Sequence, residues 1–457
     1  MTKEPTRFCI IGAGYAGLGV ARAFTRRGVP YDHLEATDHL GGNWAHGVYD
    51  STSLISSKNS TQYPEYPMPE DYPTFPSRAQ MLRYLDDYAD HFGLRDAIEW
   101  RAEVVEVRPL DRTGAAGWSV RLSSGEERRY AGVVVANGHY WEPNIPHYPG
   151  TFTGRRIHSK HYKCPADLGG GNRVLVVGGG NSASDLAVEA AATFGRADIS
   201  MRRGYWFIPK TIFGIPSSEW DRFPLPMALQ RTGFRMLLRL SYGDYRRYGL
   251  DRPDHALFTK DVTVNSSLMY ALQHGKVARR PAIDRFDGET VHFVDGTCGE
   301  YDTIVWATGY HTRFPFLDES MFTWENGQPL LVEHTLVPRH ANIYIWGLVA
   351  PRSGAGRIIS RGADFLAEAA GWQRLFATPL ADIAASRLPA QSSILAGSAE
   401  ILTRIRRLRR MLHRYTRTAR KFGIGEAVRA PTPSASVETP TTDEHEAVAH
   451  GREESLV

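Results

Sequence analysis

Cysteine is scarce in this sequence, and long hydrophobic runs are absent. The 457 residues include only three cysteines, Cys9, Cys164 and Cys298, and no two of them form a C-x-x-C pair. A redox dithiol or a zinc site is therefore not expected, and a reducing cytoplasm fits this usage. No apolar run approaches the roughly 20 residues that a membrane-spanning helix needs. Because a strand is expected at Arg7–Ile11, no room is left for a secretory signal, and we expect a cytoplasmic protein without a metal centre.

Charge of one sign is not in excess over most of the chain. Lysine and arginine number 54 against 50 aspartates and glutamates, which gives a net charge of +4. The segment Thr403–Lys421 alone carries nine basic residues and no acidic one, so the remainder of the chain is mildly acidic. Because the basic character belongs to one late segment, nucleic acid is not an expected partner.

The first 35 residues have the pattern of a nucleotide-binding unit. A short apolar strand at Phe8–Ile11 leads into a glycine-rich turn, and a helix over Leu18–Arg27 follows. A second strand, Tyr31–Leu34, stops on Glu35, where a carboxylate can accept hydrogen bonds from an adenosine ribose. The glycines of such a turn allow a pyrophosphate to approach the backbone and the helix N-terminus. The residues expected to bind the nucleotide here are Gly12, Gly14, Gly17 and Glu35.

A second unit of the same kind begins at Arg173. The strand Arg173–Val177 leads into a second glycine-rich turn and the helix Ser184–Thr193. The next strand ends at Ser200, and Arg202 then lies 24 residues after Gly178, where the first unit has its acid. The acid of the first unit can accept hydrogen bonds from a ribose, whereas an arginine at this place can donate them to a phosphate. The chain thus offers one site for FAD and one for NADPH. The alternative is that the arginines are only solvated surface charge. The residues expected at the second site are Gly178, Gly180, Asn181, Ser182, Ala183, Ser200, Arg202 and Arg203.

The stretch between the two turns carries the most specific pattern in the chain. Phe152–Lys163 reads FTGRRIHSKHYK, with a histidine at His158, a tyrosine at Tyr162 and a basic residue after it. This stretch resembles the identifying motif of the flavin-containing monooxygenases, F-x-G-x-x-x-H-x-x-x-Y followed by a basic residue. The similarity runs from about Arg7 to about Gly371, which is most of the chain.

The resemblance implies further site residues. A similar G-G-x-W element runs beside the flavin in the family, which assigns Gly42 and Trp44 to the cofactor, although a turn with a core tryptophan is the alternative. An A-T-G-Y element that joins the two domains assigns Thr308 and Gly309 in the same way.

The Pro- and Tyr-rich segment 53–85 is expected to be an irregular functional loop. Family members often have an asparagine directly before a Ser-Lys pair in this loop, whereas here Ser56 precedes the pair and Asn59 follows it. Asn59 is the candidate replacement, and the catalytic residues implied by the resemblance are Asn59, His158 and Tyr162.

Hydrophobic patterning predicts the remaining elements. Residues 204–255 are aromatic and irregular, and could form a substrate lid, ordinary packing or a subunit contact. A basic helix at Ala399–Tyr415 has an apolar stripe of Ile401, Ile405, Leu408, Leu412 and Tyr415. Packing of that stripe on the body is expected, and binding to a membrane surface or an acidic partner is the alternative. The other expected elements are helices at Gln80–Phe92 and Ile358–Gly371, strands at Arg129–Ala136, Tyr301–Trp306 and Ile343–Leu348, and a hairpin at Val291–Gly296.

The resemblance implies an α/β fold with two Rossmann-like dinucleotide-binding domains, the NADPH domain inserted into the FAD domain. The expected boundaries are 1–165 and 306–398 for the FAD domain, 166–305 for the NADPH domain, 399–429 for the basic helix and 430–457 for a disordered tail. The implied function is an NADPH- and O2-dependent monooxygenase that forms a hydroperoxyflavin and oxygenates a small substrate, at nitrogen or sulfur. No side chain must then act as nucleophile.

Three other functions stay open at this point, and a homodimer is possible. A Baeyer–Villiger enzyme would share the machinery, but its motif usually has Trp where this chain has Tyr162. An enzyme that oxidises a 2-oxo acid would share the Tyr pattern and the Pro-rich loop. A nucleotide-binding sensor would share the two turns without the chemistry. A pyridine nucleotide–disulfide reductase is nearly excluded by the lack of a C-x-x-C pair.

Overall fold

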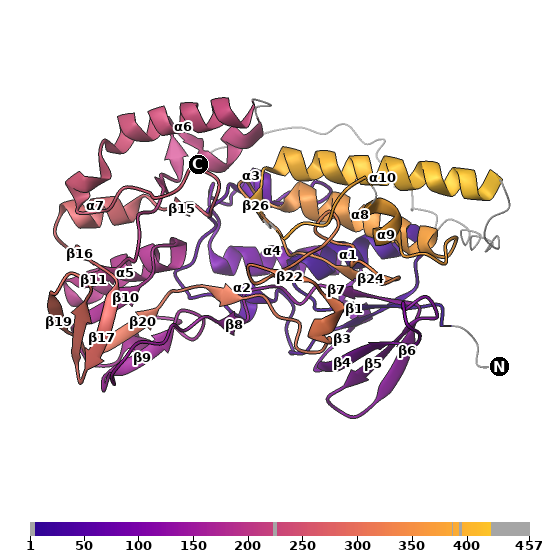
Figure 1. Ribbon diagram of the computed structural model, residues 1–457, viewed down its shortest axis with the longest axis horizontal. Coiled ribbons are helices and arrows are strands. Elements are labelled where there is room, and N and C mark those ends of the chain that lie inside the picture. The colour runs from indigo at the N-terminus through magenta and orange to yellow at the C-terminus, as the bar shows by residue number, and fades with distance from the viewer. Residues whose placement is uncertain (1–4, 223–225, 386, 393–394, 422–457) are drawn as a thin grey trace, which may run out of the picture. The chain divides into compact units, whose positions relative to one another are not determined.

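Two parallel β-sheets organise the chain. The computed structural model describes residues 5–222, 226–385, 387–392 and 395–421. One five-stranded sheet has the order β24-β7-β1-β2-β3, and a second has the order β16-β11-β10-β20-β9 (Figure 1). The strands of the first sheet are β1 Phe8–Ile11, β2 Tyr31–Leu34, β3 Ile98–Glu99, β7 Gly132–Val135 and β24 Ile343–Ile345. Those of the second are β9 Arg155–His158, β10 Val174–Val177, β11 Ala197–Ser200, β16 Val277–Arg280 and β20 Thr303–Trp306.

The second domain is an insertion in the first. All strands of the second sheet lie between β7 and β24, which are neighbours in the first sheet. The fold is therefore the expected α/β architecture with two Rossmann-like domains. β9 pairs with β20, so the expected domain boundary at residue 165 falls after a strand of the second sheet.

The predicted strand–turn–helix units are confirmed. In the first, α1 (Tyr15–Arg27) follows β1 directly, and β1 pairs in parallel with β2 from Phe8 opposite Tyr31. In the second, α5 (Asn181–Phe194) follows β10, and β10 pairs with β11. Both helices begin about three residues earlier than the apolar pattern suggested, because the first helical turn belongs to the glycine-rich loop rather than to the core.

The expected strand Arg129–Ala136 is wrong, because the chain forms two strands there. β6 (Glu127–Tyr130) pairs antiparallel with β5 (Trp118–Leu122), whereas β7 joins the first parallel sheet. Gly132 begins β7 where a Cβ would lie 2.3 Å from the Phe8 ring and 2.6 Å from the Asn342 carbonyl oxygen. A side chain at this first position of β7 would collide with both neighbours, so glycine is required where the chain enters the parallel sheet.

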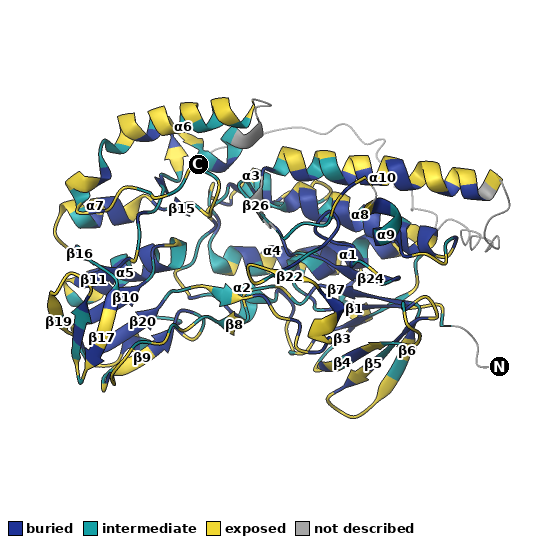
Figure 2. Cartoon of the chain, viewed as in Figure 1, coloured by how far each residue is buried: buried dark blue, intermediate teal, exposed yellow. Residues whose placement is uncertain are grey.

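Two segments that seemed irregular contain helices. α6 (Met227–Tyr242) fills the middle of the 204–255 segment and is largely exposed or half-buried (Figure 2). Leu238 is the one buried residue of this helix. The Pro- and Tyr-rich segment contains α3 (Lys58–Thr61) and the start of α4 (Arg78–His91), whose N-terminus has a capping box between Ser77 and Gln80.

The remaining predictions of elements agree with the structure. α8 (Gly356–Gln373) and the hairpin of β18 (Thr290–Phe293) and β19 (Cys298–Glu300) lie where they were expected. Among the described residues, no helix is both long and apolar enough to cross a membrane, and none of their His, Cys, Asp and Glu side chains gather as a metal site would require. The tail expected at 430–457 lies outside the described residues.

The basic helix packs on the body of the first domain. α10 (Ser398–Lys421) lies against α8, which in turn packs on α1. Ile401, Ile405, Leu408 and Leu412 are buried as predicted, whereas Tyr415 is exposed. Ion pairs flank the stripe: Arg404 Nε lies 2.8 Å from the buried Glu333 carboxylate, and Arg409 pairs with Glu368. Figure 2 shows the same helix as a buried inner face and an exposed outer face.

Truncation of one stripe residue should loosen this helix. Leu408 is fully buried, so Leu408→Ala should lower the free energy of opening α10 by about 2–5 kcal/mol. Hydrogen exchange of the α10 amides measures that free energy directly. Arg407→Ala, on the exposed face, is the control and should change it by less than about 0.5 kcal/mol. Equal protection in both variants would contradict the packing of the stripe.

Candidate functional site

A cavity of about 1120 Å³ is lined by both domains. The first domain contributes Asn43, Trp44 and His139, and the second contributes its glycine turn and the two arginines that follow β11. The carboxyl ends of β10, β11 and β20 all reach this cavity, which is where open α/β sheets bind their ligands.

The three glycines of the first turn differ in what requires them. Gly12 has φ +101°, and a Cβ at Gly17 would lie 1.9 Å from the Gly12 carbonyl oxygen, so both are needed for the turn and the helix to pack. A Cβ at Gly14 would meet nothing closer than the Gly42 Cα at 3.6 Å, which is an ordinary contact. The fold therefore does not require a glycine at Gly14, and a ligand close to the backbone is the remaining reason for one.

Glu35 is buried at the end of β2, beside this turn. Its Oε2 accepts from the Ala13 amide at 2.7 Å, and its Oε1 accepts from the Thr37 amide at 3.0 Å and hydroxyl at 2.8 Å. These bonds fix the carboxylate, which retains acceptor sites that a ribose could use.

The G-G-x-W element leaves two polar atoms without partners. It forms α2 (Asn43–His46), and the Oδ1 of Asn43 and the Nε2 of His46 are buried with no hydrogen bond from the described residues. A Cβ at Gly47 would lie 1.8 Å from the Asn43 Oδ1, so that glycine admits the side chain. Buried polar atoms cost free energy unless they are bonded, so this element suits a polar ligand beside Trp44.

The second turn repeats the division of roles. Gly178 has φ +140°, and its Cβ would lie 2.3 Å from the Ala307 carbonyl oxygen, whereas a Cβ at Gly180 has no neighbour within 4 Å. Ala183 is fully buried, and Asn181 Oδ1 accepts from the Val264 amide at 2.7 Å. Ser182 also lines the cavity, and Ser200 does so while its hydroxyl donates to the Pro281 carbonyl at 2.6 Å.

Two arginines line the cavity after β11. Arg202 is exposed and forms no ion pair with the described residues. Arg203 has its Nε buried without a hydrogen bond from any described residue, and its guanidinium lies 5.2 Å from the centre of the Tyr205 ring. A buried, unbonded guanidinium nitrogen disfavours the interpretation of Arg203 as ordinary solvated charge.

His158 and Tyr162, for which the resemblance implies a catalytic role, are not among the residues that line the cavity. His158 Nε2 donates to the Gly309 carbonyl at 3.1 Å, and Nδ1 accepts from the Lys160 amide at 3.2 Å. Burial lowers the pKa of His158 to about 4, so the ring is neutral at physiological pH. The Tyr162 hydroxyl donates to Glu189 at 2.9 Å inside the second domain, and burial raises its pKa. The His158 side chain thus bonds to the backbone, and the Tyr162 side chain bonds to α5 within the second domain.

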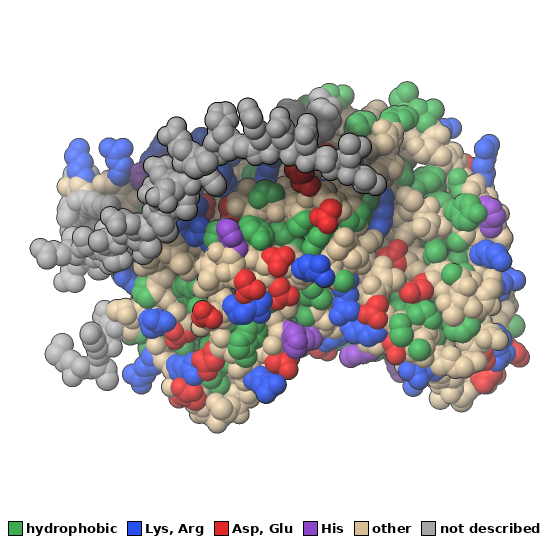
Figure 3. All heavy atoms as spheres, turned by 180° about the vertical axis from the view of Figure 1, so that it is seen from behind, with side chains coloured by type: hydrophobic (Ala, Val, Ile, Leu, Met, Phe, Trp, Pro, Cys, Tyr) green, Lys and Arg blue, Asp and Glu red, His purple; other side chains and the backbone are tan. Residues whose placement is uncertain are grey.

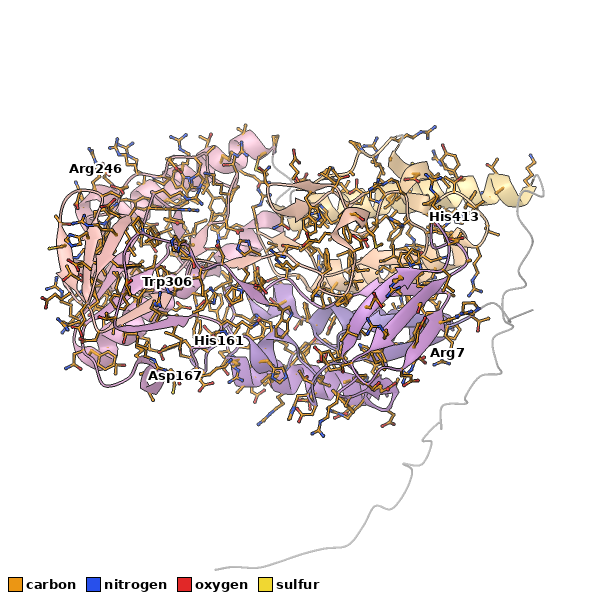
Figure 4. All side chains as sticks on the ribbon, turned by 60° about the horizontal axis from the view of Figure 1, so that its bottom comes forward. Arg7, His161, Asp167, Arg246, Trp306 and His413 are labelled. Atoms are coloured by element: carbon orange, nitrogen blue, oxygen red, sulfur yellow. The ribbon has the colours of Figure 1, made fainter. Side chains whose placement is uncertain are left out.

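The motif connects the two domains. Lys163 Nζ donates to the carbonyls of His46 at 2.6 Å and Val48 at 2.9 Å, at the end of α2. Figure 4 labels His161 and Asp167 on this connecting segment, and the Asp167 carboxylate accepts from the Lys163 amide at 2.7 Å.

Asn59, the candidate replacement for the family asparagine, is also not among the residues that line the cavity. Lys58 Nζ donates to three carbonyls in 69–72, fixing α3 with Asn59 exposed to solvent. Ser56, at the position of that asparagine, does line the cavity, and its hydroxyl bonds to that of Thr61 at 2.7 Å.

Sequence reasoning missed His139 and Asn144. His139 lines the cavity with Nε2 buried and unbonded, and burial lowers its pKa to about 4. The signal was its place four residues after the end of β7, beyond the carboxyl end of a parallel strand. The backbone of Asn144 holds the turn at Gly309. Its N–H donates to the Gly309 carbonyl at 3.0 Å, and its carbonyl accepts from the Thr308 hydroxyl. Thr308 and Gly309 line the cavity as expected.

Two solved structures share this fold. The structure of cyclohexanone monooxygenase with bound epsilon-caprolactone is 17% identical, with a TM-score of 0.71, over 90% of this chain and 98% of that one. The structure of OTEMO in complex with FAD and NADP is 18% identical, with a TM-score of 0.62, over 81% of this chain and 85% of that one. At these identities the likeness concerns the fold alone.

Sequence comparison reaches closer relatives. Dimethylaniline monooxygenase (N-oxide-forming) 2 of Oryctolagus cuniculus is 30% identical over 374 residues, which are 76% of this chain and 69% of that protein. Indole-3-pyruvate monooxygenase YUCCA1 of Oryza sativa subsp. japonica is 32% identical over 322 residues, 67% of this chain and 77% of that protein. The family model described as flavin-binding monooxygenase-like matches residues 5–368. Together with the two glycine turns on one cavity, this match shows that the chain belongs to the flavin-binding monooxygenase-like family.

Proposed function

We propose that this protein is an NADPH- and O2-dependent FAD monooxygenase that oxygenates a small organic substrate at nitrogen or sulfur. The observation that carries the proposal is the pairing of two unlike nucleotide turns, one with Glu35 beside it and one followed by Arg202 and Arg203. A carboxylate suits a ribose, and arginines suit a phosphate.

FAD fits the first domain. Gly14 leaves room at the N-terminus of α1, Glu35 offers acceptor sites, and the unbonded Asn43 Oδ1 would gain a partner beside Trp44. When bound, the flavin supplies the redox and oxygen chemistry: NADPH gives two electrons, one oxygen atom goes to the substrate and the other leaves as water.

NADPH fits the second domain. Gly180 leaves space at the N-terminus of α5, and Arg202 and Arg203 stand where an adenosine 2′-phosphate would be held. Arg203 Nε, unbonded within the described part of the chain, would gain an acceptor.

The protein's own residues orient and enclose the reactants. The neutral His158 ring fixes the Gly309 turn, and Lys163 attaches the second domain to α2. No nucleophile or general base is required from the chain, so the buried positions of His158 and Tyr162 agree with the proposal.

The choice of substrate class follows the motif and the relatives. Tyr162 stands where Baeyer–Villiger enzymes usually have Trp, and one relative is named as N-oxide-forming. Oxidation of a 2-oxo acid is the second candidate, because another relative is named as an indole-3-pyruvate monooxygenase.

Product analysis tests the function. The purified protein should carry FAD and, with NADPH and O2, should convert an alkyl sulfide to its sulfoxide or a tertiary amine to its N-oxide. Mass spectrometry with a ketone and a 2-oxo acid offered in parallel separates the alternatives. Esters from the ketone without any N- or S-oxide would overturn the substrate class, and a colourless protein that cannot be reconstituted with FAD would overturn the function.

Two matched glycine variants test the cofactor assignment. Both Gly14 and Gly180 have extended backbone that alanine can adopt, and neither added methyl would collide with the protein. We expect Gly14→Ala to lower FAD retention without changing the fold, and Gly180→Ala to raise the NADPH KM while FAD stays bound. FAD content from absorbance and NADPH kinetics measure the two effects. The same pattern of losses in both variants would mean that the two turns do not hold different nucleotides.

Arg202 should decide between NADPH and NADH. A hydrogen bond to a charged group contributes about 1.5–3 kcal/mol, so Arg202→Ala should raise the NADPH KM by about 10- to 150-fold. The exposure of Arg202 favours the lower end of this range. NADH lacks the phosphate and should be nearly unaffected, and the maximal rate of flavin reduction should change little. Steady-state kinetics with both nucleotides gives the answer, and equal losses for both would make the arginine structural.

A further inference from the structure

A second cavity, of about 1280 Å³, lies in the segment whose role the sequence left open. It is formed by α6, by the turn η4 (Tyr245–Tyr248) and by residues 252–257. Six arginines line it, and we call it the arginine cavity. They are Arg231, Arg235, Arg239, Arg246, Arg247 and Arg252. Figure 4 labels Arg246 at the margin of the second domain.

The arginine cavity has a large excess of positive charge. Asp244 is the one acidic residue in its lining, and it already pairs with Arg246 at 2.8 Å and Arg252 at 2.7 Å. Arg252 and Arg246 hold the pKa of Asp244 well below its usual range, so this carboxylate stays ionised. Arg235, Arg239 and Arg247 form no ion pair with the described residues. Like charges at one site repel each other, and a bound anion would relieve that repulsion.

Two buried nitrogen atoms in the lining lack partners. The His255 side chain is 6% exposed, its Nδ1 lies 2.6 Å from Asp254, and its Nε2 is buried without a hydrogen bond from the described residues. Arg231 Nε is buried and unbonded as well. A buried polar atom without a partner costs roughly 1–3 kcal/mol, so both atoms indicate a polar ligand rather than plain solvated surface.

The floor of the arginine cavity is apolar and aromatic. Leu238, Tyr245 and Leu257 are buried there, and Trp206 lies beside them. The Trp206 Nε1 donates to the His255 carbonyl at 2.9 Å, and the Tyr245 hydroxyl donates to the Phe207 carbonyl at 2.9 Å. The polar ends of both rings are thus used within the protein, and the Tyr245 ring packs edge-on against Trp206 and Phe207. A rim of guanidinium groups over an apolar floor suits a molecule with an acidic head and an apolar body.

We propose that the arginine cavity binds organic anions, carboxylates or phosphate esters with an apolar or aromatic body, and that the substrates of this enzyme belong to that class. Arg231 lines both this cavity and the main one, so the two meet at its side chain. An anion held by the rim would therefore lie next to the cavity where the nucleotide turns meet. The claim about substrates rests on the proposed monooxygenase function, whereas the claim about binding does not.

A lipid surface is the competing occupant for this face. The outer side of α6 exposes Leu229, Met236 and Leu240, and hydrophobic side chains gather at the edge that α6 forms (Figure 3). A bilayer would contact those three side chains, but it would not reach the buried His255 Nε2 and Arg231 Nε. The unbonded buried atoms favour a small anion that enters the cavity.

Binding to the FAD-loaded protein tests the site without turnover. The probes are phenylacetate and phenyl phosphate. Phenylethanol is the control that keeps the aromatic ring without the charge, and inorganic phosphate is the control that keeps the charge without the ring. Titration calorimetry should show binding of both aromatic anions, and weaker or no binding of the other two. Equal affinity for phenylethanol, or no gain of phenyl phosphate over inorganic phosphate, would overturn the proposed ligand class.

Paired variants locate the site. Arg235→Gln with Arg239→Gln removes two unpaired rim charges, and we expect at least a tenfold loss of affinity for both aromatic anions. Arg414→Gln with Arg417→Gln removes the same charge from the exposed face of α10 and should change affinity less than about twofold. If both double variants lost the same affinity, the effect would come from net charge alone, and the proposed site would be overturned. The protein could instead sediment with anionic vesicles, lose this in the rim variant, and bind none of the small anions. That result would assign the face to a membrane and overturn the proposed ligand.

Catalysis separates this proposal from the proposed function. With (phenylthio)acetate and 2-(phenylthio)ethanol as matched sulfides, kcat/KM for sulfoxide formation should favour the acid, and the rim variant should lose that preference. Turnover with no preference for the acid would overturn the substrate claim while the monooxygenase function stands. Anion binding without any NADPH-dependent oxygenation would overturn the monooxygenase function while the binding site stands.

Discussion

Burial keeps the His158 ring neutral, and its Nε2 can then donate to the Gly309 carbonyl while its Nδ1 accepts from the Lys160 amide. This arrangement fixes the turn after β20 against the start of the connecting segment. Lys163, five residues on, holds the end of α2 in the other domain through two carbonyls. A Cβ at Gly154 would lie 2.6 Å from the Asp302 carbonyl oxygen, so β9 can approach β20 only with glycine there. The position of the two nucleotide turns on one cavity depends on these contacts.

Several buried polar atoms that accept or donate no hydrogen bond within the described part of the chain lie at the two cavities. Asn43 Oδ1, His139 Nε2 and Arg203 Nε belong to residues that line the first, and His255 Nε2 to one that lines the second. Each such atom lowers the stability of the protein unless something bonds to it. A ligand that bonded to these atoms would recover that cost.

The arginines of the chain serve two different purposes. On α10 the apolar stripe is packed on α8, and Arg404 and Arg409 pair with carboxylates, so these charges stabilise a docked helix. On α6 most residues are exposed, and Arg235 and Arg239 have no carboxylate partner among the described residues. Net charge alone did not separate the two helices. The difference arises because carboxylates lie beside Arg404 and Arg409 of α10, whereas none of the described carboxylates pairs with Arg235 or Arg239 of α6.

The sequence by itself determined the two strand–turn–helix units, the acid after β2 and the arginines after β11, because these depend on local spacing and on glycines in short turns. It also placed the apolar stripe of α10, apart from Tyr415. It did not determine that Arg129–Ala136 is split, since the two halves pair with different strands, β6 with β5 and β7 with β1 and β24. Nor did it show that His158 and Tyr162 face backbone and core, or that Asn59 faces solvent. Those orientations depend on contacts between residues far apart in the chain, so only the tertiary structure could decide them.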